Sequence, residues 1–100
     1  MADLTHAQLT RMIYIDGRLV STGRLNRSDI TSAFSLSVPL AVSDIQAYRQ
    51  INPGRIEYDS SAKAYLVIGG SSPAYPAALR MAVATAVNAV ADAIRTAPHA

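Results

Sequence analysis

The sequence predicts a small, mainly α-helical domain with one β-hairpin, followed by a separate alanine-rich helix. Three features predict this class. Apolar residues recur at helical spacing in the first half of the chain, two short β-type segments follow a Pro-Gly turn, and alanine dominates the C-terminal segment. With 100 residues, 50% of them hydrophobic, the chain has material for one core. We therefore expect a helical domain over residues 1–68, a linker over 69–73 and a C-terminal helix over 74–100.

The first helix is expected to run from Leu4 to about Val20. Its apolar residues are spaced by three and four positions, as in an amphipathic helix, and Gly23 is a typical residue after a helix end. Arg24-Leu25 is then expected to form a short extended link. The apolar positions of the helix are Leu9, Met12, Ile13, Leu19 and Val20.

A second helix is expected to start after Asn26 or Ser28, since both residue types are good N-caps. Its apolar side would consist of Ile30, Ala33 and Phe34. The segment Ser-Leu-Ser that follows interrupts this helix and separates it from the next one.

Pro39 marks the start of a third helix rather than a break in a longer one. In a helix interior a proline costs about 3 kcal/mol, but in the first turn no intrahelical hydrogen bond is lost. Ser37 is a suitable N-cap directly before that turn. We expect the helix to end near Ile51, because Asn-Pro-Gly follows and favours a turn. Its buried face is expected to contain Ala41, Ile45 and Tyr48.

The segments RIEYD (residues 55–59) and AYLVI (residues 64–68) are expected to form a β-hairpin. Both contain β-branched or aromatic residues, and the four residues between them suit a short connection. Tyr58 and Tyr65 are expected to lie in the core or to pair across the two strands.

The alanine-rich segment from Ala74 to Thr96 is expected to be one helix with a seam of larger apolar side chains. A helix this apolar is poorly matched to solvent, and the preceding elements suffice for a core of their own. We therefore expect a homodimer with this helix as the main interface, the alternative being that it folds back on its own domain. The expected interface residues are Leu79, Val83, Ala86, Val87, Val90 and Ile94.

The predicted order of elements is that of a winged helix-turn-helix domain. Four positions around the turn fit the motif, which needs a turn residue, an apolar plug, a polar cap and a small residue, here Ser35, Leu36, Ser37 and Ala41. Glycine is common at the turn position because the backbone there has a positive φ, so serine is a mild departure. In such domains the helix after the turn enters the major groove of DNA.

Three segments, GRLNRSDI, SVPLAVSDIQAY and NPGRIEYDSSAKAYL, resemble the N-terminal winged helix of WYL-domain transcriptional regulators. The resemblance covers Arg18 to Tyr65 and is greatest to repressors of bacterial phage-defence loci, with a more distant similarity to DeoR-like winged helices. It implies a homodimeric DNA-binding repressor that reads an inverted repeat. We therefore expect double-stranded DNA and a second copy of the chain as partners.

Two departures from that family pattern matter. The residues after Ile68 are too few for the ligand-sensing WYL domain, so we expect no small-molecule ligand. The family tends to have polar residues where this chain has Leu40 and Val42. Aliphatic groups can contact a thymine methyl but reduce hydrogen-bonded base readout, so either the target sequence differs or this surface binds something other than DNA.

The resemblance and the helix periodicity place one set of residues at DNA. On the third helix, Ser43 and Gln46 would contact base edges and Arg49 a base or a phosphate. Residues at the start of the second helix and on the hairpin would contact phosphates, which position the protein without specifying sequence. The alternative is an ordinary solvated surface. The expected DNA-binding residues are Arg24, Arg27, Ser28, Ser37, Val38, Pro39, Leu40, Val42, Ser43, Gln46, Arg49, Arg55 and Lys63.

Catalysis and metal binding have no support in the sequence. The chain has no cysteine, which excludes disulfides, thiolate metal sites and a cysteine nucleophile. His6 and His99 have no neighbouring ligands, and the S-x-x-K pattern at residues 60–63 lies on a hairpin connection instead of a helix start. We therefore predict no enzyme, no cofactor and no metal. No apolar stretch approaches the roughly 18 residues that span a bilayer, and no signal peptide is apparent, so we expect a cytoplasmic protein.

Two other functions stay open. Eight of the nine basic residues are arginine, but a net charge of +2 is too small to indicate a nucleic-acid partner by itself. A winged helix that has lost base readout would be a protein-interaction module that binds a larger regulator. An architectural, non-specific DNA-binding protein is the third possibility, and the small charge argues against it.

Overall fold

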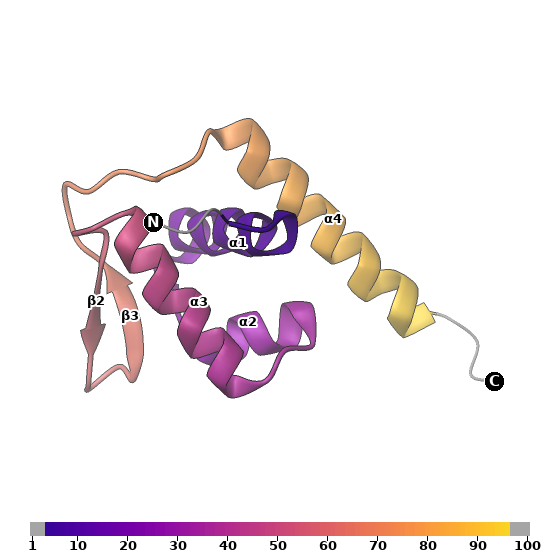
Figure 1. Ribbon diagram of the computed structural model, residues 1–100, viewed down its shortest axis with the longest axis horizontal. Coiled ribbons are helices and arrows are strands. Elements are labelled where there is room, and N and C mark those ends of the chain that lie inside the picture. Colours follow the sequence, from indigo (N-terminus) through magenta and orange to yellow (C-terminus); the bar gives the residue numbers. More distant parts are fainter. Residues whose placement is uncertain (1–3, 97–100) are drawn as a thin grey trace.

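Residues 4–96 are described by a computed structural model, in which four helices and three strands follow one another in the predicted order (Figure 1). The helices are α1 (His6–Thr22), α2 (Arg27–Phe34), α3 (Val38–Ile51) and α4 (Ala77–Thr96), and the strands are β1 (Arg24–Leu25), β2 (Ile56–Asp59) and β3 (Ala64–Val67). The predicted fold class, mainly α with a β-hairpin and a C-terminal helix, is confirmed. His99, considered above as a metal ligand, lies outside the described residues.

α1 is closed at both ends by local hydrogen bonds. The Thr5 hydroxyl accepts from the Gln8 N–H at 3.1 Å, and the Gln8 side chain accepts from the Thr5 N–H at 2.9 Å, which forms a capping box. Gly23 ends the helix with φ 73°, and its N–H donates to the Leu19 carbonyl at 3.0 Å. The predicted end at glycine is confirmed, because this position needs left-handed backbone.

The buried face of α1 differs from the predicted stripe at two positions. Leu9 and Val20 are exposed, whereas Ile15 and Asp16 are fully buried. The spacing pattern predicted the helix correctly, but the buried face that it indicated is rotated slightly about the helix axis from the observed one. A buried aspartate was not expected, since carboxylates are rarely buried without partners.

The corner between α2 and α3 has the predicted geometry. Ser35 adopts φ 54° and ψ 45°, and its N–H donates to the Thr31 carbonyl, so serine takes the left-handed conformation that glycine often supplies. Leu36 packs against the core as the plug. Ser37 precedes α3 in extended backbone without a side-chain capping bond, and Pro39 lies in the first turn. Pro39 therefore opens the helix, as predicted.

β1 pairs with the hairpin as a third strand of the sheet, a pairing that the sequence did not predict. The strand order is β1-β3-β2 and all pairings are antiparallel, with Leu25 opposite Tyr65 and Tyr58 opposite Tyr65 on the other edge. The hairpin turn contains Lys63 with φ 53°. Asp59 closes this turn by accepting from the Ser61 hydroxyl at 2.6 Å and the Ala62 N–H at 2.9 Å, and these bonds lower the pKa of its carboxyl.

The core lies between α1, α2, α3 and the sheet. Its buried side chains are Met12, Ile15, Leu19, Leu25, Ile30, Ala41, Ile45, Tyr48 and Ile56. The predicted buried residues of α3 are therefore confirmed. Of the three predicted for α2, Ile30 is fully buried, while Ala33 and Phe34 are half-buried.

α4 starts after Pro76 and buries none of its residues. Its N-terminal part crosses α1, where a Cβ added to Gly17 would lie 3.6 Å from the Cβ of Arg80, and its later turns extend past the domain (Figure 1). The segment before it, from Ile68 to Pro76, is longer than the predicted linker. By length and composition alone α4 could also span a membrane, so the expectation that no segment is long enough was wrong.

Candidate nucleic-acid interface

α3 presents an outward face that the domain leaves uncovered. Ser43, Gln46 and Arg49 are exposed on it, as the sequence predicted. The first turn adds aliphatic surface, because Val38 is 50% and Leu40 51% exposed. The helix therefore combines hydroxyl, amide and guanidinium groups with apolar groups on one accessible side, which are the chemistries that read base edges and thymine methyls.

The opposite side of α3 is held rigidly. The Arg11 guanidinium of α1 donates to both carboxylate oxygens of Asp44, at 2.6 and 3.2 Å, and this Asp44 side chain is only 6% exposed. A fork of this kind fixes the helix in rotation as well as position. It also turns a carboxylate of α3 inward and neutralises it, so this charge does not face the surface where phosphates would approach.

A groove of about 740 Å³ lies beside α3, between the start of α2 and the hairpin. Arg27 and Ser28 line one wall at the N-terminus of α2, and Lys63 lines the other at the hairpin turn. Val42, half-buried, forms part of the floor. The structure thus brings together residues from three elements that the sequence had assigned to DNA separately. The cationic side chains of Arg27 and Lys63 on opposite walls suit a phosphate group.

Arg24 lies on the edge of the same region. Its side chain is exposed, and its guanidinium is 3.5 Å from the Ala62 carbonyl of the hairpin turn. Since β1 pairs with β3, the arginine is carried beside the hairpin rather than beside α2 alone. Three of the predicted basic residues, Arg24, Arg27 and Lys63, therefore lie at or beside one groove.

Aromatic contacts connect α3 to the hairpin. The Arg49 guanidinium lies over the Tyr65 ring, 5.7 Å from its centroid, and the Tyr65 ring meets the Tyr58 ring edge-to-face at 5.2 Å. The predicted cross-strand pairing of the two tyrosines is confirmed. Stacking on Tyr65 orients Arg49, because a cation is attracted to the face of an aromatic ring.

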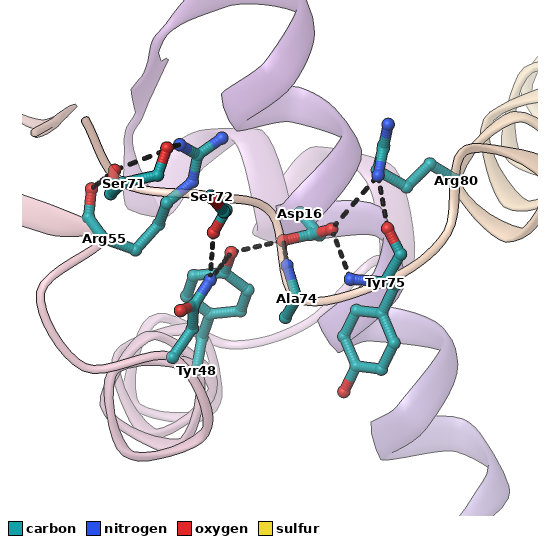
Figure 2. Close-up of polar contacts among 9 residues, drawn as sticks. Asp16, Tyr48, Arg55, Ser71, Ser72, Ala74, Tyr75 and Arg80 are labelled. Carbon is teal, nitrogen blue, oxygen red and sulfur yellow. Dashed lines mark hydrogen bonds and ion pairs between the residues drawn. The ribbon is translucent and has the colours of Figure 1, made fainter. Parts of the chain in front are cut away.

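Arg55 is not at the surface, and its assignment to DNA was wrong in this respect. It is 5% exposed, and its guanidinium donates to the Ser71 carbonyl at 3.2 Å and to the Ser71 hydroxyl at 3.1 Å (Figure 2). The side chain turns back toward the linker instead of outward along the hairpin. Its role is to hold the segment before α4.

Two accessible residues of this surface could not be foreseen from the sequence. Gln50 is exposed on α3 next to Arg49, and Tyr58 is 52% exposed and lines the groove. The alternation of Ile56 and Tyr58 suggested that both point inward, but only Ile56 is buried. β2 is a short edge strand, so one face of the hairpin is only partly covered and alternation alone did not show where the cover ends.

A helix-turn-helix followed by a β-hairpin, with a third strand between the first two helices, defines a winged helix-turn-helix domain. Residues 7–74 match the sequence model of the BrxR transcriptional regulator winged helix-turn-helix domain, and the chain belongs to this family.

The curated relatives agree with this family. The chain is 41% identical over 58 residues to a DNA-binding transcriptional repressor CapW of Escherichia coli strain KTE188, a match that covers 58% of this chain and 19% of that protein. It is 36% identical over 69 residues to CapW of Pseudomonas aeruginosa, covering 69% of this chain and 23% of that protein. The chain therefore spans about a fifth of the length of the curated relatives it matches.

Proposed function

We propose that the protein is a dimeric, sequence-specific DNA-binding regulator, a repressor that recognises an inverted repeat. The observation that carries this proposal is the exposed face of α3, flanked by a groove with Arg27 and Lys63 on its two walls. α3 would read base edges in the major groove while the groove walls contact phosphates. The names of the relatives, DNA-binding transcriptional repressors, support the same role.

α4 supplies the support for a dimer. Its predicted interface seam is largely uncovered: Leu79, Ala86, Val90 and Ile94 are exposed, while Val83 and Val87 are half-buried. Burying such side chains gains about 25 cal/mol per Å² of apolar surface. A second copy of α4 would cover the seam and present two α3 helices to one face of a duplex, which suits half-sites about one helical turn apart. A cytoplasmic location follows from such a role at the genome.

The dimer has its own test. Val90→Glu places a charge in the seam, where Val90 is 58% exposed in the single chain. We expect the dimer dissociation constant, measured by sedimentation, to rise by more than about tenfold, because a buried charge is costly. Thr85→Glu, an exposed position of α4 outside the seam residues, is the control. If Val90→Glu instead abolishes binding to lipid vesicles and leaves the dimer dissociation constant unchanged, the seam binds a membrane and not a second copy.

The deciding experiment is selection of bound duplexes from a random pool, followed by binding curves at several salt concentrations. We expect an enriched two-fold symmetric site. Arg49→Ala should weaken binding to it, and Lys63→Ala should lower the slope of log K against log salt by about one unit. Arg95→Ala, an exposed arginine on α4, is the control that should leave the slope unchanged. Absence of any preference over random DNA would contradict the proposal.

A second function, a protein-interaction module, is favoured by one observation. Leu40 exposes about half of its surface at the start of α3, where the family resemblance leads one to expect a polar residue, and Val38 beside it adds further exposed aliphatic surface. If Leu40→Gln abolishes a stoichiometric protein complex and DNA selection enriches no site, the protein is an interaction module and not a DNA-binding regulator.

A further inference from the structure

A buried carboxylate lies where three parts of the molecule meet. Asp16, in the middle of α1, is fully buried, and its two oxygens accept hydrogen bonds from α3 and from the segment before α4 (Figure 2). Oδ1 accepts from the Tyr48 hydroxyl and from the Ala74 N–H at 2.9 Å, and Oδ2 accepts from the Tyr75 N–H at 3.0 Å. The Arg80 guanidinium of α4 lies 3.8 Å from Oδ2. We call these five residues the Asp16 network.

The network joins α3 to α4 through named bonds. Tyr48 belongs to the buried face of α3, and Arg80 to the first turn of α4, where it also donates to the Tyr75 carbonyl. Burial and the hydrogen bond to Asp16 raise the pKa of the Tyr48 hydroxyl, so that it stays a donor even in alkaline solution. A second connection runs beside it, since the Asn52 amide at the end of α3 donates to the Ser72 carbonyl at 2.9 Å and to the Tyr48 hydroxyl at 3.3 Å.

Apolar packing does not fix α4 in the same way. None of its residues is buried, and apolar contact through half-buried alanine and valine side chains is non-directional. The buried carboxylate instead holds the segment before α4 through directional hydrogen bonds from the Ala74 and Tyr75 amides. Arg80 joins the first turn of α4 to the same carboxylate, so a shift of this turn removes the cationic partner of a buried charge. The close crossing of α1 and α4 at Gly17 lies next to Asp16, so the network is located at the contact between these two helices.

We propose that Asp16 is the positioning residue that sets the angle between the recognition helix α3 and the dimer-forming helix α4, and that it thereby determines which half-site spacing the protein accepts. This inference rests on the proposed function, since spacing has a meaning only for a dimer on DNA. In such a dimer the distance between the two α3 helices follows from the α3–α4 angle in each chain. A loosened angle gives a range of distances and a tolerance for several spacings.

The first test measures the angle without DNA or a dimer partner. The chain has no cysteine, so Gln50→Cys on α3 and Ala89→Cys on α4, both exposed, allow clean spin labelling. Labelled full-length chains are diluted with unlabelled protein, so that only distances within one chain are recorded. We expect a single narrow distance, which broadens in Arg80→Ala and in Asp16→Asn. An unchanged narrow distance in both variants would overturn the proposal, whatever the outcome of the DNA selection.

The second test measures spacing on DNA. The selected half-site is placed twice in duplexes whose centre-to-centre spacing changes in single base pairs. We expect the unmodified protein to prefer one spacing at least about tenfold over its neighbours, and Arg80→Ala to reduce that preference to less than about threefold. Its affinity for a single half-site should stay within about twofold. Arg95→Ala removes the same charge from the far end of α4 and should keep the preference.

The outcomes separate a positioning role from a purely structural one. If Arg80→Ala loses single-site affinity and two-site affinity in proportion, the network only stabilises the fold, and the proposal is wrong. If Arg80→Ala weakens the dimer itself in sedimentation, Arg80 belongs to the interface, and the proposal is also wrong. If the unmodified protein selects no DNA while the spin-label distance still depends on Arg80, the proposed function fails but the control of the α3–α4 angle stands.

Discussion

α1 and α4 are both long helices with an apolar stripe, but the domain covers only one of them. α1 has 17 residues and buries five of them, whereas α4 has 20 residues and buries none. Most apolar residues of α1 face the core, whereas the larger apolar residues of α4 are exposed or only half-buried. An apolar stripe on a helix therefore predicts that another surface packs against it. The stripe does not show whether that surface belongs to the same chain.

The largest expected difference between the helices concerns their ion pairs. Arg11→Ala leaves Asp44 buried without its partner, and we expect it to lower the free energy of unfolding by about 3–5 kcal/mol. Arg95→Ala removes the partner of Asp92 on α4, where both side chains are mostly exposed, and should cost about 0–1 kcal/mol. Urea denaturation of both variants measures the two values. Equal losses would mean that α4 is held in the domain as firmly as α1.

Two isoleucines, one on each helix, test directly how far the domain buries the apolar stripe. Ile15 is fully buried in α1, so Ile15→Ala should lower the free energy of unfolding by about 2–5 kcal/mol. Ile94 in α4 is 69% exposed, so Ile94→Ala should change it by less than about 0.5 kcal/mol in dilute protein.

Thermal unfolding of the two isoleucine variants at several protein concentrations distinguishes the helices further. If α4 is covered by a second copy, the effect of Ile94→Ala on the thermal midpoint should grow as the protein concentration rises, because association stabilises the folded state by mass action. The effect of Ile15→Ala should not depend on concentration. A concentration-independent loss for Ile94→Ala would indicate that α4 folds back on its own domain.

The smallest expected effect concerns the helix ends. Thr5→Ala removes the capping box of α1 and should cost about 1 kcal/mol. Thr96→Ala makes the same chemical change in α4, where the hydroxyl only donates to the Asp92 carbonyl within the helix, and should be nearly neutral. Differential calorimetry resolves the two. A cost at Thr96 equal to that at Thr5 would contradict the idea that the end of α4 contributes little to the folded domain.

The sequence predicted those parts of the fold that depend on local chemistry. Gly23, Ser35 and Pro39 mark helix ends and starts through backbone preferences, and the structure has each at its predicted place. It did not predict the pairing of β1 with β3, because a two-residue strand has no periodicity to detect. The burial of Asp16 was also missed, since its partners include backbone amides of residues 74 and 75, far away in the sequence.

The same division holds for the candidate interface. The exposed face of α3 could be predicted, because Ala41, Ile45 and Tyr48 define the opposite side by helical spacing. Arg55 could not, because its burial depends on the path of a linker whose course follows no repeat. The sequence alone does not distinguish a basic hairpin residue that faces solvent from one that packs against the linker. Only tertiary contacts show the difference.

The pairing of β1 with β3 has a consequence for how a duplex would be gripped. β1 is the continuation of α1, and the Val67 N–H donates to the Gly23 carbonyl at 3.0 Å, so the hairpin is fastened to the helical body at its base. A hairpin fastened in this way keeps a constant separation from α3, and a bound duplex would have to conform to it. Sites would then be ranked partly by how easily their steps bend and how wide their grooves are, including base pairs that no side chain reaches.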